Sequence, residues 1–161
     1  MNEFLLPAWR RWLLVGGAAA IAAVPLSFVI WRAPSGVVAP PSSLLPAFMT
    51  IGVVIPALSF GLGVAFLLLG RKLVDLERAP RLARAAFFSI GWLLVNWWPH
   101  SNFHRVANGW TNIVLVDSFF HTTVIIATGV VAAFYLKSAR ERQAGPRAAA
   151  DPRVRASASA L

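Results

Sequence analysis

The sequence contains no cysteine, and only 13% of its 161 residues are charged. The lack of cysteine excludes a disulfide framework, thiol redox catalysis and metal sites with cysteine ligands. Soluble domains carry about 25% charged residues, so this chain has too little polar surface to cover a water-soluble core. With 58% apolar residues and a mean hydropathy of +0.66, the composition indicates one domain that lies in a lipid bilayer.

Catalytic motifs are also missing from the sequence. Ser101 and Ser118 lie near histidines, but neither has the G-x-S-x-G pattern of a nucleophile elbow. There is no glycine-rich phosphate loop and no dinucleotide-binding fingerprint. The sequence motifs therefore assign the protein to no class of enzyme.

Four apolar runs are long enough to cross a bilayer, which requires about 20 helical residues. Pro25, Pro46 and Pro56 fall inside these runs and predict kinks, because neighbouring helices can satisfy the carbonyl groups that proline leaves free. The sequence thus predicts an all-α fold, a polytopic membrane protein whose residues 1–136 form a bundle of four transmembrane helices. The predicted spans cover residues 13–31, 44–70, 81–98 and 113–136.

The basic residues are distributed unevenly over this topology. Thirteen of the fifteen lysines and arginines lie on one side of this topology: before the first span, between the second and third spans, in the first four residues of the third, or after the fourth. Only Arg32 and Arg105 lie on the other side. The positive-inside rule therefore predicts that both termini are cytoplasmic. Arginine outnumbers lysine thirteen to two, which is typical of GC-rich bacterial genomes, so we expect a bacterial inner (plasma) membrane.

Residues 137–161 predict a basic, disordered cytoplasmic tail, because they are rich in alanine, arginine, proline and serine and contain Gly145-Pro146 as a helix stop. Basic residues after a span favour contact with anionic lipid headgroups. Nucleic acid is not an expected partner, since no basic motif is interleaved with aromatic residues.

Arg10-Arg11 followed by an apolar run resembles the start of a signal peptide. The run is about 18 residues long, however, and signal cores have about 7–15. The segment after Trp31 is also a poor cleavage site. We therefore favour an uncleaved first span; cleavage would leave three spans with the same orientation.

Pairs of small residues recur at four-residue spacing, which lets helix backbones approach closely. Such pairs join helices within one chain or between chains, so a homo-oligomer or a larger membrane complex stays open. The pairs are Gly16 with Ala20, Ser59 with Gly63, and Gly129 with Ala133.

The three histidines and the only acid inside a predicted span lie close together in the sequence. His100 and His104 share one helix face, and Asp117 and His121 share another, because each pair is four residues apart. The third and fourth spans are joined by a short loop and should be antiparallel neighbours. Since ionisable groups avoid lipid, we expect these side chains to converge with Asn96 on the extracytoplasmic side.

Two polar stripes support this expectation. We expect the stripes to face each other, with Pro99 either starting a short helix through Ala107 or kinking a continuous third span. At 100° per residue, one stripe contains Ser89, Asn96 and His100, and the other contains Asp117, His121, Thr128 and Tyr135.

Three imidazoles and one carboxylate match the nitrogen and oxygen ligands of zinc, copper or iron. The sequence therefore predicts a transition-metal site at His100, His104, Asp117 and His121. With all four bound, a zinc site would be closed. If Asp117 instead holds a ligand's free ring nitrogen, one coordination position stays open for water or substrate.

Three alternatives remain. The cluster is purely structural if Asp117 pairs with Arg105, and the protein is then a non-enzymatic accessory or assembly subunit of a larger complex. A b-type haem could be held by His121 with His100 or His104. A proton relay could follow the polar stripe of the fourth span.

Overall fold

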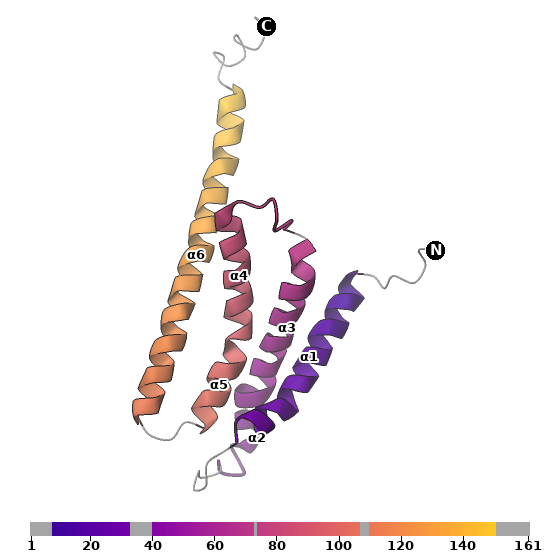
Figure 1. Ribbon diagram of the computed structural model, residues 1–161, viewed down its shortest axis with the longest axis vertical. Coiled ribbons are helices and arrows are strands. Elements are labelled where there is room, and N and C mark those ends of the chain that lie inside the picture. The colour runs from indigo at the N-terminus through magenta and orange to yellow at the C-terminus, as the bar shows by residue number, and fades with distance from the viewer. Residues whose placement is uncertain (1–7, 33–39, 73, 107–109, 151–161) are drawn as a thin grey trace, which may run out of the picture.

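The computed structural model describes residues 8–32, 40–72, 74–106 and 110–150, and these residues form helices and turns without strands (Figure 1). The prediction of an all-α fold is therefore confirmed. The elements in chain order are α1 (Ala8–Ile30), α2 (Leu45–Met49), the π-helical turn η1 (Thr50–Val54), α3 (Ile55–Leu69), the 3-10 turn η2 (Gly70–Lys72), α4 (Arg81–Val95), α5 (Trp97–Val106) and α6 (Trp110–Ala150).

Three helical stretches in the described residues are long and apolar enough to cross a membrane, namely Ala8–Ile30, Leu45–Leu69 and Ile113–Gln143. They correspond to the first, second and fourth predicted spans. The predicted span over 81–98 differs, because α4 has 15 residues and is only about 22 Å long. The helix is interrupted at Asn96, since Pro99 has no N–H to donate to the carbonyl group of Val95.

Two of the three prolines in the apolar runs lie within continuous helical segments. Pro25 lies inside α1, and the helical path also continues through Pro56. Pro46 instead stands in the first turn of α2, where proline removes no helical hydrogen bond. Pro56 cannot donate the α-helical hydrogen bond to the carbonyl group of Gly52, and Ser101 Oγ of α5 donates to that oxygen at 3.0 Å.

The long helices pack in chain order, α1 on α3, α3 on α4 and α4 on α6. Helices α1 and α6 thus lie at opposite edges of an open row (Figure 1). This arrangement does not confirm the predicted bundle of four transmembrane helices. The row positions α4, α5 and α6 side by side, and the predicted cluster lies on α5 and α6.

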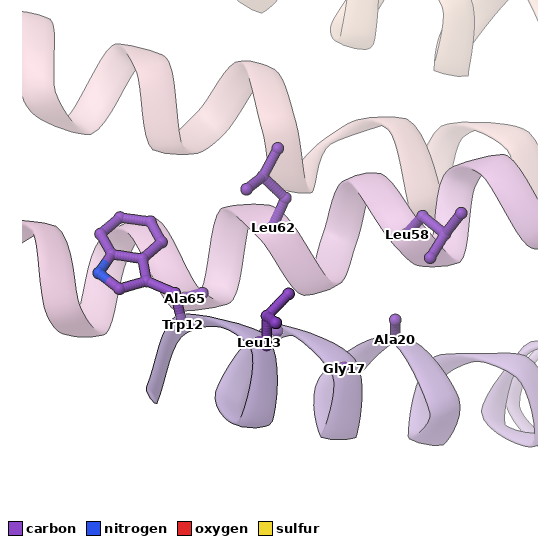
Figure 2. A pocket seen from close by; sticks show the side chains of 8 residues that line it. Trp12, Leu13, Gly17, Ala20, Leu58, Leu62 and Ala65 are labelled. Atoms are coloured by element: carbon purple, nitrogen blue, oxygen red, sulfur yellow. The ribbon is translucent and has the colours of Figure 1, made fainter. Parts of the chain in front are cut away.

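Two of the three small-residue pairs are used within the chain. A Cβ atom at Gly61 would overlap the carbonyl oxygen of Gly16 and lie 2.8 Å from Ala20 Cβ, so α1 and α3 are in backbone contact. Beside this contact, Trp12 and Leu13 of α1 and Leu58 and Leu62 of α3 line an apolar groove (Figure 2).

The second pair faces α4. Ser59 Oγ donates to the carbonyl group of Leu94 at 2.8 Å, and a Cβ atom at Gly63 would lie 2.6 Å from Val95 Cγ2. Gly129 and Ala133 of α6 are exposed, and nothing lies within 4 Å of a Cβ atom built at Gly129. Only this third pair is left without a neighbouring helix in the described part of the chain.

Helix α6 continues beyond the predicted end of the fourth span. It runs through Gly145 and Pro146 to Ala150, so the predicted helix stop and the disorder of residues 137–150 are wrong. Alanine and arginine are strong helix formers, and Lys137 and Glu141 form an ion pair of 3.7 Å one turn apart. Residues 151–161 of the predicted tail lie outside the described residues.

The basic residues gather at one end of the row. The start of α1, the connection from α3 to α4 and the C-terminal part of α6 lie at this end, and α5 and the start of α6 lie at the other (Figure 1). Described basic side chains on these elements are Arg10, Arg11, Arg71, Arg78, Arg81, Arg84, Lys137, Arg140 and Arg142.

Candidate metal centre

Helix α5 carries two of the histidines and is held in place by α1. Trp98 is buried, and its Nε1 donates to Ser27 Oγ at 2.8 Å. Arg105 Nη2 donates to the backbone carbonyl groups of Ser27 and Trp31 at the end of α1. Because both ends of α5 are bonded to α1, the histidines between them have a fixed position.

The structural alternative expected Arg105 to pair with Asp117. In the structure Arg105 has other partners. Its guanidinium binds carbonyl oxygens of α1 and the amide oxygen of Asn102 at 3.2 Å. The last turn of a helix has free carbonyl groups that attract a cation, which explains why Arg105 is drawn to α1. Asp117 is left to the histidines.

Helix α6 supplies Asp117 and His121 from its first third. His121 Nδ1 donates to the backbone carbonyl group of Asp117 at 2.8 Å. A carbonyl oxygen can only accept, so Nδ1 carries the proton and Nε2 of the neutral ring has a free lone pair. A histidine that donates one ring nitrogen in this way presents the other as a metal ligand.

The side chains from the two helices meet as the sequence predicted. Nε2 of His104 lies 2.7 Å from Asp117 Oδ1, and Nε2 of His100 lies 3.2 Å from the same oxygen. The two Nε2 atoms are 2.9 Å apart. The His121 ring lies across the His100 ring, with 5.2 Å between their centroids. All three histidines of the chain thus surround one carboxylate.

Three of these residues could hold a metal ion. One ligand atom each from His100, Asp117 and His121 lies within 4.8 Å of the other two. In a tetrahedral site with bonds of about 2.0–2.1 Å, ligand atoms stand about 3.3 Å apart, so these atoms would have to approach one another by up to about 1.5 Å to bind one ion. Two imidazoles and one carboxylate suit zinc and also form the ligand set of non-haem iron sites.

The environment of the cluster suits neutral imidazole ligands. The His100 side chain is 18% exposed and that of Asp117 is 31% exposed, whereas His104 is 42% exposed. Burial lowers the pKa of His100, and its hydrogen bond with Asp117 offsets part of this effect. Since a metal binds the neutral ring, burial makes His100 available as a ligand at neutral pH.

The polar stripes face each other only near the cluster. Asp117 is half-buried, but Thr128 and Tyr135 are exposed, and Tyr135 has 71% of its surface exposed. The expectation that the whole stripe of α6 faces the third span is therefore wrong. Thr128 and Tyr135 lie outside the packed face of α6, whose buried or half-buried residues continue through Ala127 and Phe134. The stripe therefore forms no continuous buried polar path for a proton relay in the described residues.

The haem alternative named His121 with His100 or His104 as axial ligands. The rings of His100 and His121 contact each other directly, with 5.2 Å between their centroids and 88° between their planes. Two axial imidazoles instead lie on opposite faces of a porphyrin. The arrangement of His100 and His121 therefore does not favour a haem between them.

Beside the cluster lies a cavity of about 220 Å³ between α4, α5 and α6. His100 and His121 form part of its wall, together with Asn96 at the break before α5. Sequence reasoning missed its apolar wall, although the spacing of the residues was a signal. Residues 93, 96, 97 and 100, and residues 117, 120, 121 and 124, each follow the i, i+3, i+4, i+7 pattern of one helix face. The apolar members that line the cavity are Leu93, Trp97, Phe120 and Val124.

No protein-family model, curated protein or solved structure matches this chain. The fold and the site therefore define its class by themselves. It is an all-helical protein with helices long and apolar enough for a membrane, and it has a His100/Asp117/His121 group that could hold a metal ion.

Proposed function

We propose that the protein is an integral inner-membrane protein that binds a transition-metal ion on its extracytoplasmic side. His100, Asp117 and His121 are the ligands, and His104 donates to Asp117 and orients its carboxylate. The observation that carries this proposal is that three ligand atoms from two different helices lie within 4.8 Å of one another. Histidines and acids without a shared role would have no reason to bring their ligand atoms together in this way.

Three protein ligands leave coordination positions open for water or substrate. Zinc in such a site polarises its bound water, whereas iron or copper supplies redox chemistry. The mixed nitrogen and oxygen ligands favour these three ions over magnesium or calcium, which prefer oxygen alone. In this proposal the exposed side of the cluster, at His104 and His121, is the route by which the ion enters.

The distribution of basic residues supports an orientation with both termini in the cytoplasm, and a spacing on α6 supports the span itself. The basic residues gather at the end of the row opposite the histidines, as the positive-inside rule requires. Asp117 and Lys137 of α6 are twenty residues apart, which is about 30 Å of helix and matches the hydrocarbon core. The carboxylate and the lysine then lie at opposite interfaces, and neither charge is in lipid.

Metal content tests the proposed function. Purified protein loaded with zinc, iron(II) or copper(II) and then desalted is expected to retain about one ion of the preferred metal per chain, measured by mass spectrometry. Asp117→Asn is expected to lose most of it, because the amide is a weak neutral ligand. Asp75→Asn is the matched control, since that carboxylate is exposed and its one ion pair among the described residues is with Arg78. Wild-type protein without stoichiometric metal, or equal retention by both variants, would contradict the proposal.

The absence of cysteine makes the orientation directly testable. Single cysteines at Ser42, in the turn before α2, and at Arg78, between α3 and α4, report opposite ends of the row. In intact cells an impermeant maleimide is expected to label Ser42→Cys at least tenfold faster than Arg78→Cys, and lysis should remove the difference. Faster labelling of Arg78→Cys would reverse the orientation.

A second candidate function is that of an accessory or assembly subunit in a larger membrane complex. The exposed pair Gly129 and Ala133 favours it, because the other two small-residue pairs already pack helices within the chain. In this case the pair would contact a helix of a partner or of a second copy. A metal-free wild-type protein in the experiment above would favour this candidate.

A further inference from the structure

The cavity beside the cluster contains a polar group without a partner. Asn96 is 3% exposed, and its Oδ1 accepts no hydrogen bond within the described structure. Leaving a buried acceptor unpaired costs about 1–3 kcal/mol, so such atoms are rare unless a ligand or water completes them. Asn96 lines the cavity, so a molecule there lies next to the residue whose buried oxygen lacks a donor.

The wall of the cavity restricts what can occupy it. Leucine, tryptophan, phenylalanine and valine side chains line it, and it contains no lysine, arginine, aspartate or glutamate. Apart from the proposed ion at His100 and His121, a charged molecule would therefore lose its hydration without gaining an opposite charge from a side chain. A cavity of about 150 Å³ holds benzene, so a cavity of about 220 Å³ accommodates one ring with a small substituent.

We infer that this cavity is a binding site for a small, uncharged, largely apolar molecule with one hydroxyl or N–H group, which donates to Asn96 Oδ1. The inference rests on the proposed function in one respect, because His100 and His121 both line the cavity and hold the ion. A molecule bound to Asn96 then lies beside the open coordination positions of the metal. The ligand class is that of phenols and similar single-ring alcohols, which enter from the membrane.

A matched pair of probes tests the inference on the full chain in lipid nanodiscs. 4-Fluorophenol carries the donor and fluorobenzene lacks it, and fluorine NMR titrations measure both affinities for the wild-type protein. We expect saturable binding of 4-fluorophenol at least fivefold tighter than that of fluorobenzene. In Asn96→Leu, which removes the acceptor, the preference is expected to fall below twofold.

Two further variants test the position of the site without altering Asn96. Val124→Phe fills the cavity from α6 and is expected to weaken binding of both probes at least fivefold. Ile125→Phe places the same ring on the neighbouring residue, which is 71% exposed, and should bind both probes as the wild type does.

No saturable binding in the wild type, equal affinity for the two probes, or a preference that survives in Asn96→Leu would overturn the inference. Zinc content measured on the same samples separates the two proposals. Protein that binds zinc but does not prefer 4-fluorophenol would contradict only the cavity site. Protein that prefers 4-fluorophenol but binds no zinc would contradict only the metal centre.

Discussion

Replacing His121 by alanine is expected to weaken zinc binding about 1,000-fold, whereas replacing His104 should weaken it about 10- to 100-fold. Structural zinc sites bind with about 10–16 kcal/mol, so each of three ligands accounts for about 4 kcal/mol. His121 supplies a lone pair from Nε2, because its Nδ1 is committed to the backbone of Asp117. His104 contacts the carboxylate oxygen and orients it, and such supporting contacts typically contribute 10- to 100-fold.

Competition with a fluorescent zinc chelator at pH 7 measures these affinities for each variant in detergent. His100→Ala is expected to match His121→Ala, since both residues belong to the three-ligand group. Both His104 and His121 are exposed, so their replacement leaves the core of the fold intact, and helical circular dichroism should confirm this. Equal losses for all three histidines would show a closed four-ligand site, and an undiminished affinity in His121→Ala would refute the site itself.

The sequence was sufficient to predict which chemical groups meet. Spacing of four residues placed His100 with His104 and Asp117 with His121, and the cost of ionisable groups in lipid turned the two faces toward each other. The structure adds which contacts form. A helical phase of 100° per residue groups Tyr135 with Asp117, but it does not show which part of the helix surface a neighbour covers. Tyr135 lies outside that part.

The fixation of α5 could not be predicted, because it depends on the ends of other helices. Arg105 has one acid nearby in sequence, and pairing with Asp117 was the simplest expectation. Its actual partners are the carbonyl groups at the end of α1, nearly eighty residues away in the chain. A residue that contacts the backbone leaves no pattern of side-chain types, so this contact requires three-dimensional information.

The helical tail was missed for a related reason. Glycine followed by proline commonly ends a helix. The part of α6 before Pro146 is long, and Pro146 removes only one of the many hydrogen bonds in this helix. The local signal therefore failed because helix formation is cooperative along the whole element.

Replacing Gly61 by valine is expected to destabilise the protein by about 3 kcal/mol, at the upper end of the range for overpacked cores. The added Cβ atom would overlap the carbonyl oxygen of Gly16 and crowd Ala20, so the obstacle is the backbone of α1. A flexible side chain could rotate away, but a helix backbone must move as a unit. The contact between α1 and α3 should therefore open.

Gly129→Val is the matched control, because nothing lies within 4 Å of a Cβ atom at that position. Unfolding titrations in mixed micelles, followed by circular dichroism, are expected to place Gly129→Val within about 0.5 kcal/mol of the wild type, as for other surface changes. The milder Gly61→Ala should be partly rescued by Ala20→Gly, which removes the nearest side-chain atom and leaves the carbonyl group of Gly16. Equal stability of Gly61→Val and Gly129→Val would mean that α1 does not approach α3 at Gly61, and α5 would then lose the partner that fixes its histidines.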